Sequence, residues 1–263
     1  MNKVLNFEFR KLLHSPIFYF CILAIVMGNV MNTVVYKLID MVAMNNVVNE
    51  TMNGMGLDVM MVTVTGANMF VTAFSNSSLI TIISIFVALF MCEDFSNNTI
   101  KNIIARGYTR NNVIVSKLFS TMIAVFIMTI VALVTGFLSG WLIGKAVGDW
   151  SAKLLLYSMG YILSAIAYTA IYASISMMFR KAAPSIAVTL LSSSFVPLIL
   201  KALSNIFEIK NFDLELISLS NATMATLKTT YNWHDLSSLL ICASIYLIIG
   251  VISCIWLFKK KDV

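Results

Sequence analysis

Residues 118–143 read LFSTMIAVFIMTIVALVTGFLSGWLI and contain no charged side chain. A helix needs about 20 mostly apolar residues to cross the roughly 30 Å hydrocarbon core of a bilayer, so this stretch predicts a transmembrane helix. Five other stretches meet the same condition, although the polar run Ser75–Ser78 dilutes the start of one of them. The six predicted spans are 17–36, 70–91, 118–143, 154–179, 185–203 and 237–258.

The composition of the whole chain supports the same fold class. Of its 263 residues, 59% are hydrophobic and 11% are charged, and the mean hydropathy is +0.89. An ordinary soluble domain has about 25% charged residues and could not hide this much apolar surface. We therefore predict an all-α membrane protein, a six-transmembrane-helix bundle that forms one transmembrane domain over residues 1–263.

The distribution of charge predicts the orientation of this bundle. With the N-terminus inside, the inner segments hold twelve of the 18 Lys and Arg residues and four of the 12 acidic residues. Cytoplasmic loops are enriched in Lys and Arg, so both termini are expected in the cytoplasm of a bacterial cell. The inner basic residues are Lys3, Arg10, Lys11, Lys101, Arg106, Arg110, Lys117, Arg180, Lys181, Lys259, Lys260 and Lys261.

Two segments outside the spans have amphipathic character. Residues 1–16 mix apolar and basic side chains, which favours an interfacial elbow helix on the cytoplasmic surface, broken from the first span by Ser15-Pro16. The long outer loop 204–236 contains a semi-apolar stretch at 214–227 that is too short to span. It fits a re-entrant broken helix or an external amphipathic helix equally well.

The spans lack the residues of a chemical active site. The nearest approach to a phosphate-binding loop, Gly140 to Ala146, is one residue short and has alanine in place of the magnesium-binding hydroxyl. Both histidines lie outside the spans, and no catalytic serine motif or mid-membrane acid pair occurs. The four cysteines have no metal-site spacing and are expected to be free thiols. We predict no enzyme activity, cofactor, metal or nucleic-acid site in this chain.

Polar and small residues within the spans are interpreted as packing features. Gly136, Gly140 and Gly144 recur every four residues and so share one helical face, which permits close approach of a neighbouring helix. Asn29 in the first span is more typical of an interhelical hydrogen bond than of a substrate ligand.

The most informative segment outside the spans is EDFSNNTIKNIIARGYTRNNVIVSK, residues 93–117. A polar turn precedes a short helical stretch, Thr99–Arg106, with Ile100, Ile103 and Ile104 on one face and Gly107 as its C-cap. Such a helix on the cytoplasmic side suits docking to another protein, and it suits a basic hairpin lying on lipid headgroups equally well. The Glu93-Asp94 pair at the membrane boundary is interpreted as solvated or helix-capping.

This segment resembles the corresponding loop of the ABC-2 type permease family, whose members often show a Glu, a Gly-Thr pair and a downstream Lys. The matching residues are Glu93, Thr99, Lys101, Gly107, Arg110 and Lys117, while Asn98 stands where a glycine is common. The resemblance implies that residues 93–107 form a coupling helix seated on a separate ATP-binding subunit, which binds ATP and Mg. The implied ATPase-coupling residues are Glu93, Thr99, Ile100, Lys101, Ile103, Ile104, Gly107 and Arg110.

The family resemblance also implies a second permease copy or a paralogue, a lipid environment, and short re-entrant helices in the last outer loop. The leading functional hypothesis is therefore the permease subunit of a bacterial ABC exporter that moves a hydrophobic or amphipathic substrate, such as a peptide, lantibiotic or drug. The alternative is a non-transporting membrane scaffold or sensor.

Overall fold

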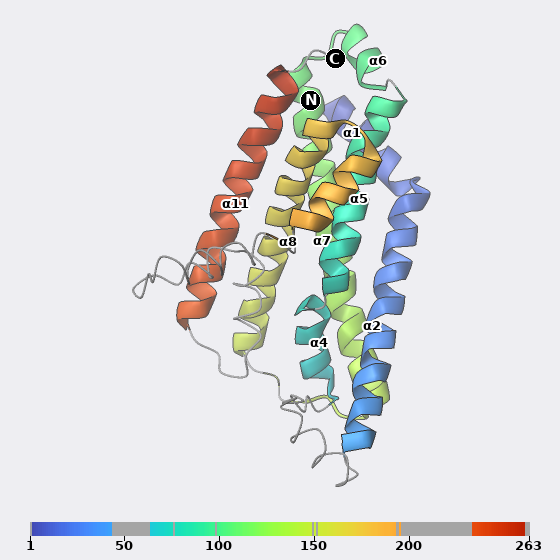
Figure 1. Ribbon diagram of the computed structural model, residues 1–263, viewed down its shortest axis with the longest axis vertical. Helices are drawn as coiled ribbons and strands as arrows, with labels where there is room; N and C mark the ends of the chain where they lie inside the picture. Colours follow the sequence, from blue (N-terminus) through green and yellow to red (C-terminus); the bar gives the residue numbers. More distant parts are fainter. Residues whose placement is uncertain are drawn as a thin grey trace.

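The computed structural model describes residues 2–43, 64–75, 77–97, 99–148, 150, 152–192, 195 and 233–260. These residues form helices and short connections, with no strand among them. Figure 1 shows the long helices running side by side, with α1, α6 and the end of α11 at one end of the bundle. We call this end the α6 end.

Within the described part of the chain, five helices are long and apolar enough to cross a membrane. The membrane-crossing segments are Pro16–Met41 in α2 (Pro16–Ala43), Leu79–Ser96 in α5 (Ser77–Ser96), Arg110–Gly144 in α7 (Arg110–Gly144), Leu154–Phe179 in α8 (Ala152–Phe179) and Leu236–Lys259 in α11 (Trp233–Lys260). The chain is therefore a multi-pass membrane protein.

One of the six predicted spans differs from the structure. The predicted span 70–91 is divided between α4 (Gly66–Ser75) and α5, because the polar run at 75–78 marks a break between two helices. The described part of the predicted span 185–203 belongs to an apolar helix, Ala182–Ser192. The remainder of that predicted span lies mostly outside the described residues, as does the loop 204–232.

The N-terminal helix α1 (Asn2–Leu13) packs into the bundle instead of lying wholly on its surface. Val4, Glu8 and Leu12 are buried, and their i, i+4, i+8 spacing places them on one face, which packs against α7. Phe7 and Leu13 on the other faces are about half exposed. Pro16 begins α2, where its fixed backbone angle suits the first turn of a helix.

Helix α7 is central because it packs against α1, α2, α4 and α8. In α5 and α8, 56% of the most apolar segment is buried within the chain, but in α2 and α11 only 22% is. Helices α2 and α11 therefore lie on the outside of the bundle, and their outward apolar side chains face lipid or another protein. Asn29 of α2 donates to the carbonyl of Ala132 in α7 at 2.9 Å, so this polar side chain makes the interhelical hydrogen bond expected from the sequence.

At the end opposite α6, the glycines of α7 face α4 in the same chain. A Cβ on Gly136 would lie 2.5 Å from the Cβ of Ala73, and one on Gly140 would lie 2.6 Å from the Cβ of Met69. The N-terminus of α4 is also fixed by hydrogen bonds, since the backbone N–H of Gly66 donates to the carbonyl of Ala146 at 2.9 Å. These close contacts hold α4 directly against the glycine face of α7.

Candidate functional site: the α6 end

The short helix α6 (Thr99–Ala105) lies between α5 and α7 at one end of the bundle (Figure 1). Gly107 follows it with a φ of +88°, a conformation that glycine adopts without strain. Its N–H donates to the carbonyl of Ile104 at 2.9 Å and closes the last turn. Arg110 then begins α7. The helix and its glycine terminator therefore lie where the sequence places them.

The apolar face of α6 points into its own bundle. Ile100 is only 2% exposed, and Ile104 packs against the hydrophobic core. Ile100 and Ile104 therefore anchor α6 to its own bundle, while Ile103 is half-buried at the edge of that face. The outward face carries Lys101, Asn102, Ala105 and Arg106, all of which are exposed.

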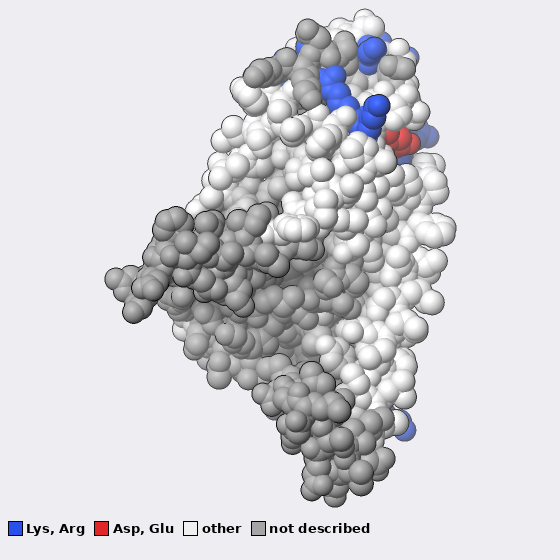
Figure 2. Space-filling view, viewed as in Figure 1, with Lys and Arg blue, Asp and Glu red and all other residues white. Residues whose placement is uncertain are grey.

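A groove of about 320 Å³ separates α6 from α1. Its floor is apolar, and Lys3 of α1 and Arg106 beside α6 contribute one basic side chain from each wall. The lining residues are Lys3, Val4, Phe7, Thr99, Asn102, Ile103, Arg106 and Tyr108. Figure 2 shows that Lys and Arg gather at this end of the molecule on the face in view. The α6 end is therefore the basic end of that face.

Beneath α6, a cluster of five ionisable side chains joins α1, α5 and α7. We call it the charged cluster, and its members are Glu8, Lys11, Glu93, Asp94 and Lys117. Asp94 is 1% exposed and accepts hydrogen bonds from both lysines. Lys11 Nζ also lies 3.0 Å from Glu93 Oε2. Asp94 is therefore a buried ionic partner, and the solvated or capping interpretation of this carboxyl is wrong.

The surroundings shift the ionisation of the two cluster members that lie outside the spans. Burial raises the pKa of Glu8 above its ordinary value, the positive charge of Lys117 lowers it in part, and repulsion from Asp94 raises it further. Burial alone would lower the pKa of Lys11, but hydrogen bonds and charge from Asp94 and Glu93 outweigh it, so the pKa of Lys11 is raised.

Sequence reasoning missed this cluster because its members lie far apart along the chain. One signal was present: Glu8 occupies the middle of the buried stripe Val4, Glu8 and Leu12, where an acid is unexpected unless it has a partner. Phe90 adds a further contact, since its ring centroid lies 4.7 Å from Lys117 Nζ. A cation held against an aromatic face is favourable when both are removed from water.

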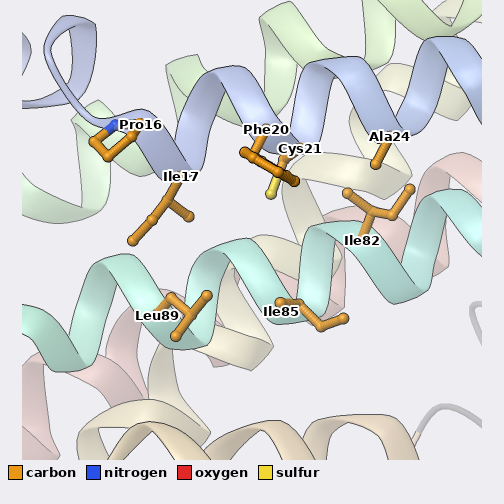
Figure 3. A pocket seen from close by; sticks show the side chains of 8 residues that line it. All are labelled: Pro16, Ile17, Phe20, Cys21, Ala24, Ile82, Ile85 and Leu89. Carbon is orange, nitrogen blue, oxygen red and sulfur yellow. The ribbon is translucent and has the colours of Figure 1, made fainter.

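A second cavity opens on the flank of the bundle between α2 and α5. This flank groove has a volume of about 390 Å³, and Figure 3 shows apolar side chains from both helices around it. The lining residues are Pro16, Ile17, Phe20, Cys21, Ala24, Ile82, Ile85 and Leu89. A cavity of this volume falls in the range of about 300–1,000 Å³ that is usual for small-molecule sites.

The helical bundle with a short helix connecting two spans at its basic end defines a polytopic α-helical membrane protein. A comparison with protein families matches the family described as ABC-2 family transporter protein over residues 4–196. Because this match covers most of the chain, the protein belongs to that family, and the resemblance seen in residues 93–117 is confirmed. No curated protein matches the sequence.

As a member of this family, the chain is a membrane component of an ABC transporter. Permeases of this family generally work with an ATP-binding subunit. The match ends at residue 196, so the extension of one domain to residue 263 stays a prediction.

Proposed function

We propose that this chain is the permease subunit of an ATP-driven exporter, and that the outward face of α6 couples it to a separate ATP-binding subunit. The observation that carries the proposal is the arrangement of α6: its apolar side is fixed to α5 and α7, while Lys101, Asn102 and Arg106 are exposed. A helix anchored on one side and free on the other transmits a displacement from a bound partner to the spans behind it.

The charge distribution supports a cytoplasmic location for the α6 end. Lys3, Lys101 and Arg106 are exposed there, and basic residues concentrate on the cytoplasmic side of bacterial membrane proteins. The start of α1 and the last turn of α11 both lie at the α6 end, which agrees with cytoplasmic termini (Figure 1). In this arrangement ATP and Mg are bound by the partner subunit.

The flank groove supports a hydrophobic or amphipathic substrate, and among the candidate classes of peptide, lantibiotic and drug we favour peptides. Its eight lining residues offer no charged side chain to a ligand. The groove lies between two membrane-spanning segments, and Phe20 in its lining is 75% exposed, so it is open to apolar molecules dissolved in lipid. The outward faces of α2 and α11 provide surface for lipids and for a second permease copy or a paralogue.

The coupling proposal is tested by reversing charge on α6 without disturbing its buried side. The Lys101→Glu, Arg106→Glu double variant is co-purified with its ATP-binding subunit in nanodiscs, and ATP hydrolysis is measured. We expect hydrolysis to fall to the level of the ATP-binding subunit alone, while the thermal stability of the permease stays unchanged. Lys145→Glu, an exposed residue at the opposite end, serves as the control and should retain full stimulation.

Ile100→Asp is unsuitable for this purpose, because a charge at a side chain that is 2% exposed destabilises the bundle itself. If the charge-reversal variant stimulates hydrolysis as well as the control does, α6 is not the coupling element. If no ATP-binding subunit co-purifies and none is stimulated, the scaffold or sensor alternative replaces the transporter proposal.

The substrate class is tested by filling the flank groove. Ala24→Trp places an indole in the groove, and Leu23→Trp places the same side chain on a surface that is already 57% exposed. We expect Ala24→Trp to reduce export of an apolar peptide from vesicles and Leu23→Trp to leave it unchanged. Equal export by the two variants would remove the flank groove from the substrate path.

A further inference from the structure

Glu8 is a fully buried carboxyl whose environment differs from that of the other acids in the charged cluster. Its side chain is 0% exposed, on the face of α1 that packs against α7. Neither Oε1 nor Oε2 has a hydrogen-bond partner among the described residues. An ionised carboxylate is strongly disfavoured away from water unless it accepts hydrogen bonds or pairs closely with a cation.

The two lysines of the cluster are directed to other acids. Asp94 accepts hydrogen bonds from Lys11 and Lys117, and Lys11 Nζ also lies 3.0 Å from Glu93. By contrast, 3.9 Å separates Lys117 Nζ from Glu8 Oε2, which exceeds hydrogen-bond distance. Glu8 is therefore the acid that the cations satisfy least.

The charges of the cluster balance only when one acid is neutral. Three carboxylates and two ammonium groups carry a net charge of −1 when all are ionised, and a net charge of zero when one carboxyl holds a proton. The ionisable groups facing Glu8 are Lys11 on its own helix, Glu93 and Asp94 on α5, and Lys117 on α7.

We propose that Glu8 is a proton-binding site, which keeps its proton at neutral pH and thereby allows α1 to seat against α7. Loss of that proton to solvent changes the cluster from neutral to −1 inside a buried contact. The result is a weaker attachment of α1 at the end of the bundle that carries α6. The cluster thus makes this attachment sensitive to the pH of the surrounding solution.

A proton fits this position better than a metal ion. The described residues contain no group of three or more His, Cys, Asp or Glu side chains placed to hold a metal. Two lysine ammonium groups in the cluster also repel a divalent cation, whereas one proton removes the excess negative charge without needing further ligands. Burial, which raises the pKa of Glu8, acts in the same direction.

The proposal concerns the chain alone, so its test needs neither the ATP-binding subunit nor transport. Infrared spectra of the purified protein in nanodiscs are recorded across a pH titration, and the carbonyl band of a protonated carboxylic acid is followed. We expect this band at neutral pH in the wild type and in Glu93→Gln, and its loss in Glu8→Gln. Absence of the band, or its persistence in Glu8→Gln, would overturn the proposal.

A second measurement tests whether Glu8 acts as a neutral group in the fold. Glutamine has the shape of a protonated glutamate, so the melting temperature of Glu8→Gln should match that of the wild type below pH 4.5 and should be at least as high as that of the wild type at neutral pH. Asp94→Asn removes a carboxylate that two lysines require, so its melting temperature should be several degrees lower. A loss of stability in Glu8→Gln as large as that in Asp94→Asn would show that Glu8 is ionised and paired with Lys117.

The pH dependence has a defined sign. Because the pKa of Glu8 is raised in the folded state above the ordinary 4.5, the unfolded chain ionises first as the pH rises. The stabilisation by Glu8 is complete below pH 4.5 and declines from there up to the folded-state pKa. Relative to Glu8→Gln, the wild type should lose stability through this window, and parallel curves for the two proteins would contradict the proposal.

Discussion

The two ends of the bundle are held together by different kinds of contact. At the α6 end, the charged cluster connects α1, α5 and α7 through hydrogen bonds and ion pairs of buried and half-buried side chains. At the opposite end, α4 rests on the glycine face of α7, where a Cβ on Gly140 would lie 2.6 Å from the Cβ of Met69. Glycine packing depends on shape and fixes two helices at one separation. Ionic contacts depend on protonation and on the position of charges. The contacts at the α6 end are therefore the ones that a change of protonation can weaken or strengthen.

The largest effect is expected at the charged cluster. Lys117→Met removes one of the two lysines that pair with the buried Asp94, and breaking a buried ion pair from one side costs about 3–5 kcal/mol. Lys37→Met is the control, since its pair with Asp40 at 3.6 Å is partly solvated and is worth at most about 1 kcal/mol. SDS titration of both variants measures the free energy of unfolding.

A double variant sharpens this prediction. Lys117→Met with Asp94→Asn removes both members of the pair, so it should be more stable than Lys117→Met alone. If Lys117→Met loses no more stability than Lys37→Met, the charged cluster does not stabilise the α6 end.

A smaller effect is expected at the glycine face. Gly140→Ala forces α4 away from α7, since the new Cβ would meet both Met69 and the carbonyl oxygen of Thr65. Overpacking of this kind costs about 1–3 kcal/mol. Gly160→Ala is the matched control in another span, because its Cβ would meet only side-chain atoms, Leu239 Cδ2 at 3.0 Å and Leu236 Cδ1 at 3.4 Å. Equal stability of the two variants would show that α4 is not held by close glycine packing.

The smallest effect is expected at the end of α6. A Cβ on Gly107 would have no neighbour within 4 Å, so the cost of Gly107→Ala comes from its φ of +88° alone and is about 1 kcal/mol. Gly107→Asn should be milder, because asparagine tolerates this backbone region better than alanine. Hydrogen exchange of the α6 amides reports the difference. Identical exchange in the wild type and Gly107→Ala would mean that the left-handed turn is not needed to end α6.

The sequence predicts features that depend on neighbouring residues better than features that depend on distant ones. The uninterrupted apolar run at 118–143 identifies α7, and Gly107 marks the end of α6, because both follow from local pattern. The polar run at 75–78 signals the division of the second predicted span, but no local pattern reveals that α4 docks on α7. The charged cluster likewise requires residues 8, 94 and 117 to meet in space.

The isoleucines of α6 show the same limit. Their spacing identifies an apolar face, but it does not indicate whether that face meets a partner protein or the helices of its own chain. Ile100 is buried against helices of its own chain. The proposed contact with the ATP-binding subunit is therefore assigned to the exposed residues Lys101, Asn102 and Arg106.

The most direct test of the account is a photocrosslinking measurement on the intact transporter complex. A photoreactive amino acid replaces Asn102 on the outward face of α6 or, in a second protein, Val147 at the opposite end, where the side chain is 44% exposed. The account predicts a crosslink from position 102 to the ATP-binding subunit and none from position 147. A crosslink to that subunit from position 147, with none from position 102, would contradict it.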